Sequence, residues 1–309
     1  MSTINQMKIL SPKHWTDYEL IDTGGFEKLE RFGSFILSRP EPQAVWSKAL
    51  PQAEWESMAN AIFWKEKEKD SENERGKWIW KNNMPQQWWI NYAYGDMKLR
   101  FRLGLTAFKH VGLFPEQADN WNYIYDGLRG MQTTQPRVLN LFAYTGGASL
   151  AARAAGADVT HVDSVRQVVT WSRENMEASN LTDIRWMVED AVKYLKREVK
   201  RGKQYQGIIL DPPAYGRGPE GEKWILEEGI NELIELCSKL LSSEKGLLVL
   251  NLYSMGFSAL VAENIIKSYF PQINGECGEL FIPDRAGRRL PLGVFMRGTT
   301  QAPKGAAYL

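Results

Sequence analysis

The sequence of 309 residues predicts a doubly wound α/β sheet together with a small α+β domain. Three observations support this prediction. Residues 138–163 have the pattern of strand, glycine turn, helix and second strand, and strands and helices alternate from residue 105 onward. Residues 1–104 instead have short aromatic runs separated by turn residues. We therefore expect a domain at 1–104, which could bind RNA or another substrate, and the α/β domain at 105–309.

Composition narrows the function classes. The formal net charge of +1 predicts no global attraction to nucleic acid, so RNA contact would depend on local clusters. No apolar run approaches the ~20 residues that a membrane span needs, and the first residues lack a signal-peptide pattern, so we expect a cytoplasmic protein without membrane contact. Cys237 and Cys277 show neither metal-ligand nor disulfide spacing, and no metal site is expected. Two basic clusters are candidate RNA contacts: Lys196, Arg197, Lys200, Arg201 and Lys203, and Arg285, Arg288 and Arg289.

The first domain is predicted element by element. Residues 18–40 predict a hairpin with its turn at 22–25, and a helix is expected at 52–63 after Pro51. Further antiparallel strands are expected at 76–83, 86–95 and 97–105. Two roles are open for the tryptophans of this domain, filling the core of a small sheet or stacking on nucleobases. They are Trp15, Trp46, Trp55, Trp64, Trp78, Trp80, Trp88 and Trp89.

The stretch 138–163 predicts the first β-α-β unit of the sheet. An apolar strand at 138–141 leads into Tyr144, Thr145, Gly146 and Gly147, and a helix follows until Gly156. Glycines at such a turn allow a ligand to approach the backbone, and Asp163 stands where a carboxylate can accept hydrogen bonds from ribose hydroxyls. Because the turn matches neither the dinucleotide nor the P-loop motif, the expected ligand has a ribose but no pyrophosphate, which indicates S-adenosylmethionine.

The remaining elements continue the alternation. Helices are expected at 164–180, 191–202, 224–242 and 258–270, strands at 184–190, 207–211 and 246–254, and a closing hairpin at 278–284 and 291–297. The helix at 224–242 has a single apolar stripe, which predicts that Cys237 is a small core residue. Its members are Leu226, Ile230, Leu233, Ile234, Cys237, Leu240 and Leu241.

A second chemical motif, LDPPAYGRG, occupies residues 210–218. Asp211, Pro212 and Pro213 directly follow a buried strand, so they are expected at the same sheet edge as Gly146 and Asp163. The prolines fix φ and lack amide donors, which should hold the neighbouring carbonyls ready to accept hydrogen bonds. Asp190, at the end of the third strand, is placed to meet an adenine amino group, although alone it would be an ordinary helix N-cap.

Together NLFAYTGG, VED, LDPPAYGRG and the upstream KHVGLFPEQADN resemble the class I S-adenosylmethionine-dependent methyltransferases related to the 23S ribosomal RNA cytosine-C5 methyltransferase family. The resemblance covers roughly residues 18–309. It implies a Rossmann-like methyltransferase sheet, S-adenosyl-L-methionine as cofactor and ribosomal RNA as substrate. The N-terminal PUA domain of many relatives is not expected in this chain.

The resemblance also implies roles for single residues. Asp211, Pro212 and Tyr215 would act in catalysis, and His110, Phe114, Gln117 and Tyr253 would contact the substrate. The cofactor would be bound by Phe142, Tyr144, Thr145, Gly146, Gly147, Asp163, Ser164, Asp190, Ala191 and Asp211.

One departure concerns the mechanism. Cytosine-C5 methylation needs a thiolate to attack the ring, but Tyr253 occupies the position of the cysteine after the fifth strand. We therefore expect methylation of a base nitrogen or another atom that needs no covalent catalysis. Two alternatives stay open: methylation of a small molecule or protein, and an RNA- or protein-binding module with a vestigial cofactor pocket. The oligomeric state is also open, with a homodimer as one alternative.

Overall fold

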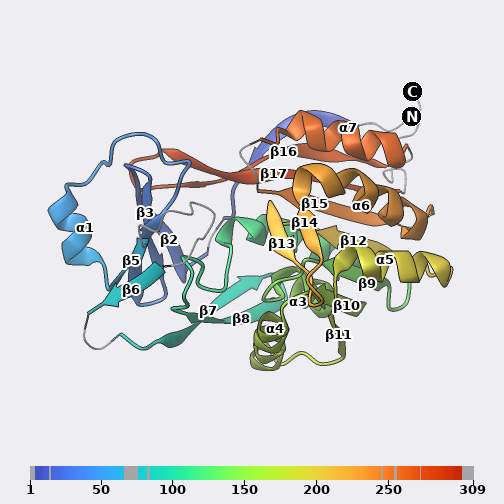
Figure 1. Ribbon diagram of the computed structural model, residues 1–309, viewed down its shortest axis with the longest axis horizontal. Coiled ribbons are helices and arrows are strands. Elements are labelled where there is room, and N and C mark those ends of the chain that lie inside the picture. The colour runs from blue at the N-terminus through green and yellow to red at the C-terminus, as the bar shows by residue number, and fades with distance from the viewer. Residues whose placement is uncertain are drawn as a thin grey trace. The chain divides into compact units, whose positions relative to one another are not determined.

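The computed structural model describes residues 4–13, 15–65, 76–81, 84–244, 246–253, 256–271 and 273–300 (Figure 1). The chain divides into two compact units. The large-sheet unit comprises residues 1–10, 117–280 and 292–309, and the N-terminal unit comprises residues 11–116 and 281–291. These bounds differ from the expected division at residues 104 and 105, because strand pairing places β1 (Ile4–Leu10) beside β16 (Asn274–Pro283) in the large sheet.

The sheet of the large-sheet unit confirms the predicted doubly wound, Rossmann-like α/β fold. Its eight strands follow the order β1-β16-β17-β15-β12-β9-β10-β11. β9 pairs in parallel with β10 and β12, β10 with β11, and β12 with β15, whereas β17 runs antiparallel to β15. The bounds are β9 (Arg137–Leu141), β10 (Asp158–Asp163), β11 (Ile184–Val188), β12 (Gly207–Leu210), β15 (Leu247–Leu252) and β17 (Arg289–Thr299).

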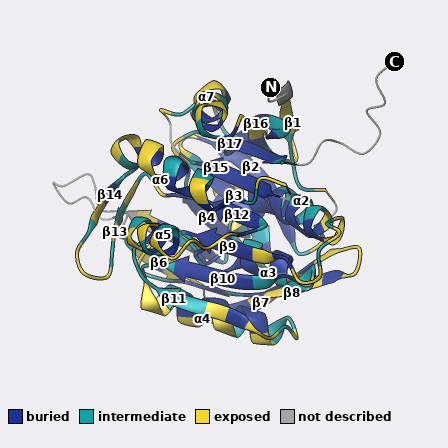
Figure 2. Cartoon of the chain, turned by 90° about the vertical axis from the view of Figure 1, so that its right-hand side faces the viewer, coloured by how far each residue is buried: buried dark blue, intermediate teal, exposed yellow. Residues whose placement is uncertain are grey.

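Helices bury their apolar faces against this sheet, and their polar faces point outward (Figure 2). One core cluster joins the strands to α5, α6 and α7 and includes the whole predicted stripe of α6 with Cys237, as expected. The bounds are α2 (Ala118–Arg129), α3 (Gly147–Ala154), α4 (Arg166–Ala178), α5 (Ala191–Lys200), α6 (Leu226–Leu240) and α7 (Ala259–Tyr269). No helix in the described part of the chain has the length and apolarity that a membrane span requires.

The short hairpin of β13 (Tyr215–Arg217) and β14 (Lys223–Ile225) was not predicted. The helix expected from residue 224 begins at Leu226 because Trp224 belongs to β14 and its indole Nε1 donates to the Pro213 carbonyl at 2.7 Å. Such a contact across the hairpin has no signature in the local sequence.

The N-terminal unit is a small α+β fold, as predicted. Its five-stranded sheet has the order β2-β3-β4-β5-β6, and β7 and β8 form a separate two-stranded ribbon. The predicted hairpin at 18–40 is instead a three-stranded meander, because Gly25 and Phe26, both with positive φ, form the first turn and Asp22 lies within a strand. The bounds are β2 (Tyr18–Gly24), β3 (Glu27–Phe32), β4 (Phe35–Pro40), α1 (Gln52–Met58), β5 (Ala61–Lys65), β6 (Gly76–Trp80), β7 (Gln87–Tyr94), β8 (Met97–Gly104) and the 3₁₀ turn η1 (Pro115–Gln117).

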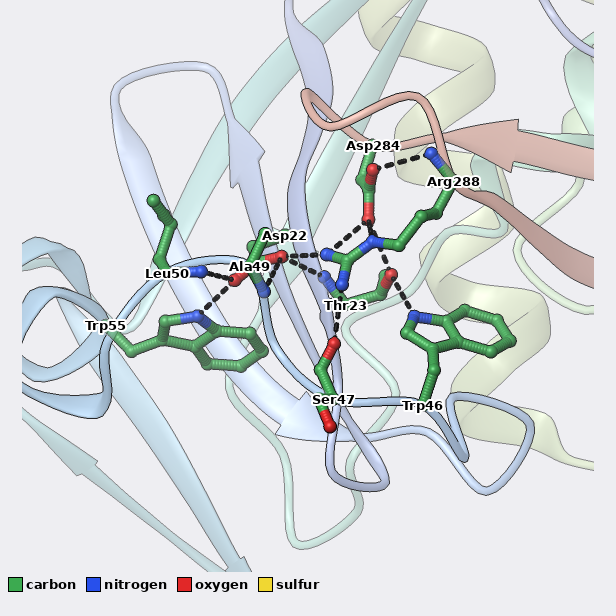
Figure 3. Close-up of polar contacts among 9 residues, drawn as sticks. All are labelled: Asp22, Thr23, Trp46, Ser47, Ala49, Leu50, Trp55, Asp284 and Arg288. Carbon is green, nitrogen blue, oxygen red and sulfur yellow. Dashed lines mark hydrogen bonds and ion pairs between the residues drawn. The ribbon is translucent and has the colours of Figure 1, made fainter.

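A buried polar network explains why residues 281–291 belong to the N-terminal unit (Figure 3). Asp22 accepts hydrogen bonds from the Leu50 backbone at 2.9 Å and from the Trp55 indole at 2.7 Å. The Arg288 guanidinium forms ion pairs with both Asp22 and Asp284. The two carboxylate side chains are 1% and 0% exposed, so the arginine supplies the charge compensation that their burial requires.

Candidate active site

The candidate site lies where the strand order reverses. β9 is flanked by β10 and β12, and the register places Leu141 beside both Val162 and Leu210. Since the three strands are parallel, the residues that follow them meet at one edge of the sheet, which is where doubly wound folds bind ligands. The structure therefore brings together the turn after β9, Asp163 at the end of β10 and Asp211 after β12.

The turn from Phe142 to Gly147 has an unusual backbone. Phe142 and Tyr144 adopt left-handed conformations with φ of 53° and 48°, and Gly146 has a φ of 92°. Left-handed non-glycine residues are uncommon and cluster at functional sites. At Gly146, a side chain would add strain and would bring its Cβ within 3.3 Å of the Ser172 Cβ.

Asp163 fixes this turn directly. Its Oδ2 accepts a hydrogen bond from the Tyr144 backbone at 2.9 Å, and its Oδ1 accepts one from the Val165 backbone at 2.9 Å. Burial raises the pKa of the Asp163 carboxyl above its ordinary value, although the backbone hydrogen bonds from Val165, Tyr144 and Ser164 lower it. Because each carboxylate oxygen has two lone pairs, Asp163 can hold the turn and still accept a hydrogen bond from a ligand hydroxyl.

A buried polar layer beneath the turn was missed from the sequence. Ser172 Oγ donates to the Tyr144 carbonyl at 2.6 Å, and Asn175 Nδ2 donates to the Thr145 carbonyl at 3.0 Å. Deeper in the unit, Ser149 Oγ lies 3.0 Å from His161 Nδ1. Burial lowers the pKa of His161 to about 3, so its ring is neutral at physiological pH. The neighbouring polar residues Thr160 and His161, inside a strand flanked by Val159 and Val162, were the available signal.

Gly147 has a packing role, and its predicted contact with the cofactor stays a prediction. A Cβ at this position would lie 2.5 Å from Cζ2 of the Trp121 indole. This glycine therefore lets α3 pack closely on α2, a requirement that exists without any ligand. Thr145 is buried at 2% exposure, and in this turn Phe142 contacts Trp224 with ring centroids 5.0 Å apart.

Asp190 and Ala191 mark the start of α5. Asp190 is the N-cap, and its Oδ1 accepts the backbone N–H of Lys193 at 2.8 Å. Ala191 is buried in the core cluster. The N-cap explains the aspartate structurally, and a contact with adenine stays a prediction.

Asp211 is paired with a residue that sequence reasoning did not select. Asn251 Nδ2 donates to Asp211 Oδ1 at 2.7 Å, because the β12–β15 register aligns the residues that follow Leu210 and Leu250. Burial raises the pKa of Asp211 to about 6, although the hydrogen bond from Asn251 lowers it. In the described part of the chain, Asn251 Oδ1 is buried without a hydrogen-bond partner. Such an atom normally finds a partner in a ligand or water.

In the segment after Asp211, the carbonyl of Pro213 is, contrary to expectation, not available to a ligand. Pro212 is buried, but the carbonyl of Pro213 accepts the Trp224 indole and is therefore already used within the protein. Tyr215, on β13, is 67% exposed, so its ring is accessible for stacking.

The four predicted substrate residues belong to different units. In the N-terminal unit, the rings of His110 and Phe114 lie 5.1 Å apart. In the large-sheet unit, Gln117 is buried and its Oε1 accepts a hydrogen bond from Asn120 at 2.9 Å, and Tyr253 follows β15. A shared pocket wall stays a prediction.

Neither cysteine is accessible to act as a nucleophile. Cys237 and Cys277 are 0% and 1% exposed, and burial raises the pKa of both thiols. Among the residues that the structure describes, no group of three or more His, Cys, Asp or Glu side chains is arranged to hold a metal ion.

Comparison with known proteins agrees with this geometry. A family model described as S-adenosylmethionine-dependent methyltransferase matches residues 69–266. The ribosomal RNA large subunit methyltransferase K/L of Shewanella frigidimarina is 30% identical over 166 residues, which cover 52% of this chain and 22% of that protein. The corresponding protein of Pseudoalteromonas translucida is 33% identical over 119 residues, 38% of this chain and 16% of its own length. The chain thus spans about a fifth of the length of these curated relatives.

Two solved structures extend the comparison. A SAM-dependent methyltransferase from Agrobacterium tumefaciens is 34% identical with a TM-score of 0.87, covering 97% of this chain and 96% of that one. The protein SMU.776, solved in complex with SAH, is 19% identical with a TM-score of 0.68, covering 92% of this chain and 76% of its own, and it shows the likeness of fold alone. The family model matches well over half of the chain, and Asp163 and Asp211 meet at the sheet edge where the strand order reverses. This protein therefore belongs to the S-adenosylmethionine-dependent methyltransferases.

Proposed function

We propose that this protein methylates RNA, and specifically ribosomal RNA, at a base nitrogen or another atom that needs no covalent catalysis. The observation that carries the proposal is the part-buried Asp211–Asn251 pair, which offers hydrogen-bond acceptors at the carboxyl end of β12 in a unit without an accessible thiol. The names of the curated relatives support ribosomal RNA as the substrate class. A cytoplasmic location follows from that substrate.

The residues at the switch point fit S-adenosylmethionine. Asp163 would accept hydrogen bonds from the ribose hydroxyls through its remaining lone pairs, and the left-handed turn at 142–146 would contact the methionine part. Asp190 would meet the adenine edge through its second oxygen. When bound, S-adenosylmethionine supplies a methyl group on a positively charged sulfur, which is open to in-line displacement.

Asp211 and Asn251 would orient the acceptor. An amino group on a base has two N–H donors, and the Asp211 carboxylate and the Asn251 Oδ1 are two neighbouring acceptors. Holding these donors directs the nitrogen lone pair, and positioning of this kind can supply ~7 to 11 kcal/mol of a reaction barrier. Tyr215, exposed on β13, would stack on a base drawn out of its helix.

The test is methyl transfer from labelled S-adenosylmethionine to ribosomal RNA, ribosomal subunits or a metabolite extract, each taken from cells that lack the protein. We expect label in ribosomal RNA, located at a base nitrogen by nuclease digestion and mass spectrometry. Label only in the metabolite extract or in protein would replace RNA by another substrate. Failure to bind S-adenosylmethionine in calorimetry would instead indicate a vestigial pocket.

The acceptor atom has a separate test. RNA containing 5-fluorocytosine traps enzymes that attack C6 with a thiolate. We expect no covalent complex. A complex that disappears in Cys237→Ser or Cys277→Ser would restore cytosine C5 as the target.

A further inference from the structure

The ribbon formed by β7 and β8 in the N-terminal unit has two chemically different faces. Its strands pair antiparallel in register from Gln87–Gly104 to Tyr94–Met97, and burial alternates along residues 87–93 of β7 and 97–103 of β8. The inward face consists of Trp88, Ile90, Tyr92, Met97, Leu99, Phe101 and Leu103, all buried. The outward face consists of Gln87, Trp89, Asn91, Ala93, Lys98, Arg100 and Arg102.

The inward face accounts for the stability of the ribbon. The Trp88 indole donates to the Phe32 carbonyl at 3.1 Å and contacts the Phe35 ring with centroids 5.6 Å apart. These contacts attach the ribbon to the turn between β3 and β4 within the same unit. The inward residues therefore anchor the ribbon within this unit.

The outward face combines cations with an exposed aromatic ring. Lys98, Arg100 and Arg102 follow one another at alternate positions of β8, about 7 Å apart along the strand. Trp89 is 38% exposed, and the Arg100 guanidinium lies 5.2 Å from its ring centroid. No residue of this face has a carboxylate. The carboxylate of Asp17 accepts hydrogen bonds from the backbone and side-chain amides of Asn91.

The two clusters chosen from the sequence take part in ion pairs within the protein. Lys196, Arg197 and Arg201 form ion pairs with Glu232, Glu189 and Glu198. Arg285 is paired with Glu19, and Arg288 with Asp22 and Asp284. Neighbouring carboxylates reduce the positive potential at both clusters.

We propose that the outward face of the β7–β8 ribbon binds single-stranded RNA. A row of cations complements a chain of phosphates, and a flat ring beside it can stack on a base of any sequence. Lys98, Arg100 and Arg102 contact phosphates, and Trp89, with the Arg100 guanidinium against it, forms the stacking platform. The proposal rests on RNA being the substrate, and it assigns part of the RNA binding to the N-terminal unit.

The experiment measures binding of a short fluorescein-labelled oligoribonucleotide of mixed sequence to the full chain at several salt concentrations. Lys98→Gln combined with Arg100→Gln removes two phosphate contacts, so the slope of log affinity against log salt should become shallower by about 1.4. Trp89→Leu should weaken binding by about 5- to 150-fold with an unchanged slope, and Trp89→Phe should recover most of the loss. The matched control combines Lys200→Gln with Lys203→Gln, which removes the same charge from an exposed site of the large-sheet unit.

A second measurement needs no variant. Ultraviolet crosslinking of RNA containing 4-thiouridine to the wild-type chain should yield crosslinked peptides from residues 87–102. RNA binding that is unchanged in the ribbon variants, with crosslinks only elsewhere, overturns the ribbon assignment and leaves the RNA substrate intact. A wild-type chain that binds no RNA overturns the assignment together with the proposed RNA substrate.

Discussion

At the scale of single residues, Asp163 connects the proposed cofactor binding to the shape of the turn. Its two oxygens hold the Tyr144 and Val165 amides, and the same oxygens are the proposed acceptors for ribose hydroxyls. We predict that Asp163→Ala weakens S-adenosylmethionine binding by ~1.5 to 3 kcal/mol, the value of charge-assisted hydrogen bonds. Calorimetry measures the dissociation constant, and Asp183→Ala, an exposed carboxylate, is the control. An unchanged constant in folded Asp163→Ala would remove the ribose assignment.

Asp211 should make turnover depend on pH. Burial raises the pKa of its carboxyl to about 6, and only the ionised form accepts hydrogen bonds with both oxygens. Turnover with saturating substrates should therefore fall as pH decreases through about 6. In Asn251→Leu the hydrogen bond that lowers the pKa of Asp211 is lost, so the fall should begin at higher pH, whereas Asn264→Leu, on the exposed side of α7, should leave it in place. A wild-type profile that is flat across this range would contradict the assignment.

The same carboxyl should affect stability with a defined sign. Because its pKa is higher in the folded state than the ordinary 3.8, folding becomes less favourable as pH rises from about 4 to about 6. Asp211→Asn removes this titration. The difference between the unfolding free energies of the variant and the wild type should therefore shift in favour of the variant by about 3 kcal/mol as pH rises from acidic to neutral values. Urea titrations at both pH values measure the difference, and a constant offset would show that burial does not perturb this group.

At the scale of elements, α4 holds the turn at 142–147 through Ser172. The Ser172 hydroxyl donates to the carbonyl of Tyr144, so Ser172→Ala should loosen the left-handed turn. We expect a stability loss of about 1 kcal/mol and a several-fold weaker S-adenosylmethionine affinity, with turnover at saturation nearly unchanged. Thr170→Ala is the matched control, because its hydroxyl donates to the Arg166 carbonyl within the same helix. Equal affinities in the two variants would show that the turn keeps its shape without α4.

At the scale of the whole molecule, Arg288 attaches the segment 281–291 to the N-terminal unit (Figure 3). Arg288→Ala leaves the buried Asp22 and Asp284 without their cation and should cost ~3 to 5 kcal/mol of stability. Arg285→Ala removes a pair that is 53% and 33% exposed, so it should cost no more than ~1 kcal/mol. Urea denaturation followed by circular dichroism compares the two, and equal losses would contradict the charge-compensation account.

The sequence by itself determined the class of the fold and the edge of the sheet at which the candidate site residues meet. Apolar periodicity identified the strands of the parallel core and the buried stripe of α6, because residues that are buried on one face of an element recur at a regular spacing in the sequence. The turn at 144–147, Asp163 and Asp211 could be placed at one edge because the carboxyl ends of parallel strands meet there. All of these inferences depend on local patterns and on one topological rule.

Only the tertiary structure decided which side chains meet. Asn251 reaches Asp211 through strand register, Trp121 occupies the space beside Gly147, and Trp224 takes the Pro213 carbonyl. The carboxylate of Asp22, which forms an ion pair with Arg288, lies 266 residues away in the chain. Partners so far apart leave no local signature, because the energy of a contact depends on distance in space and not on separation along the sequence.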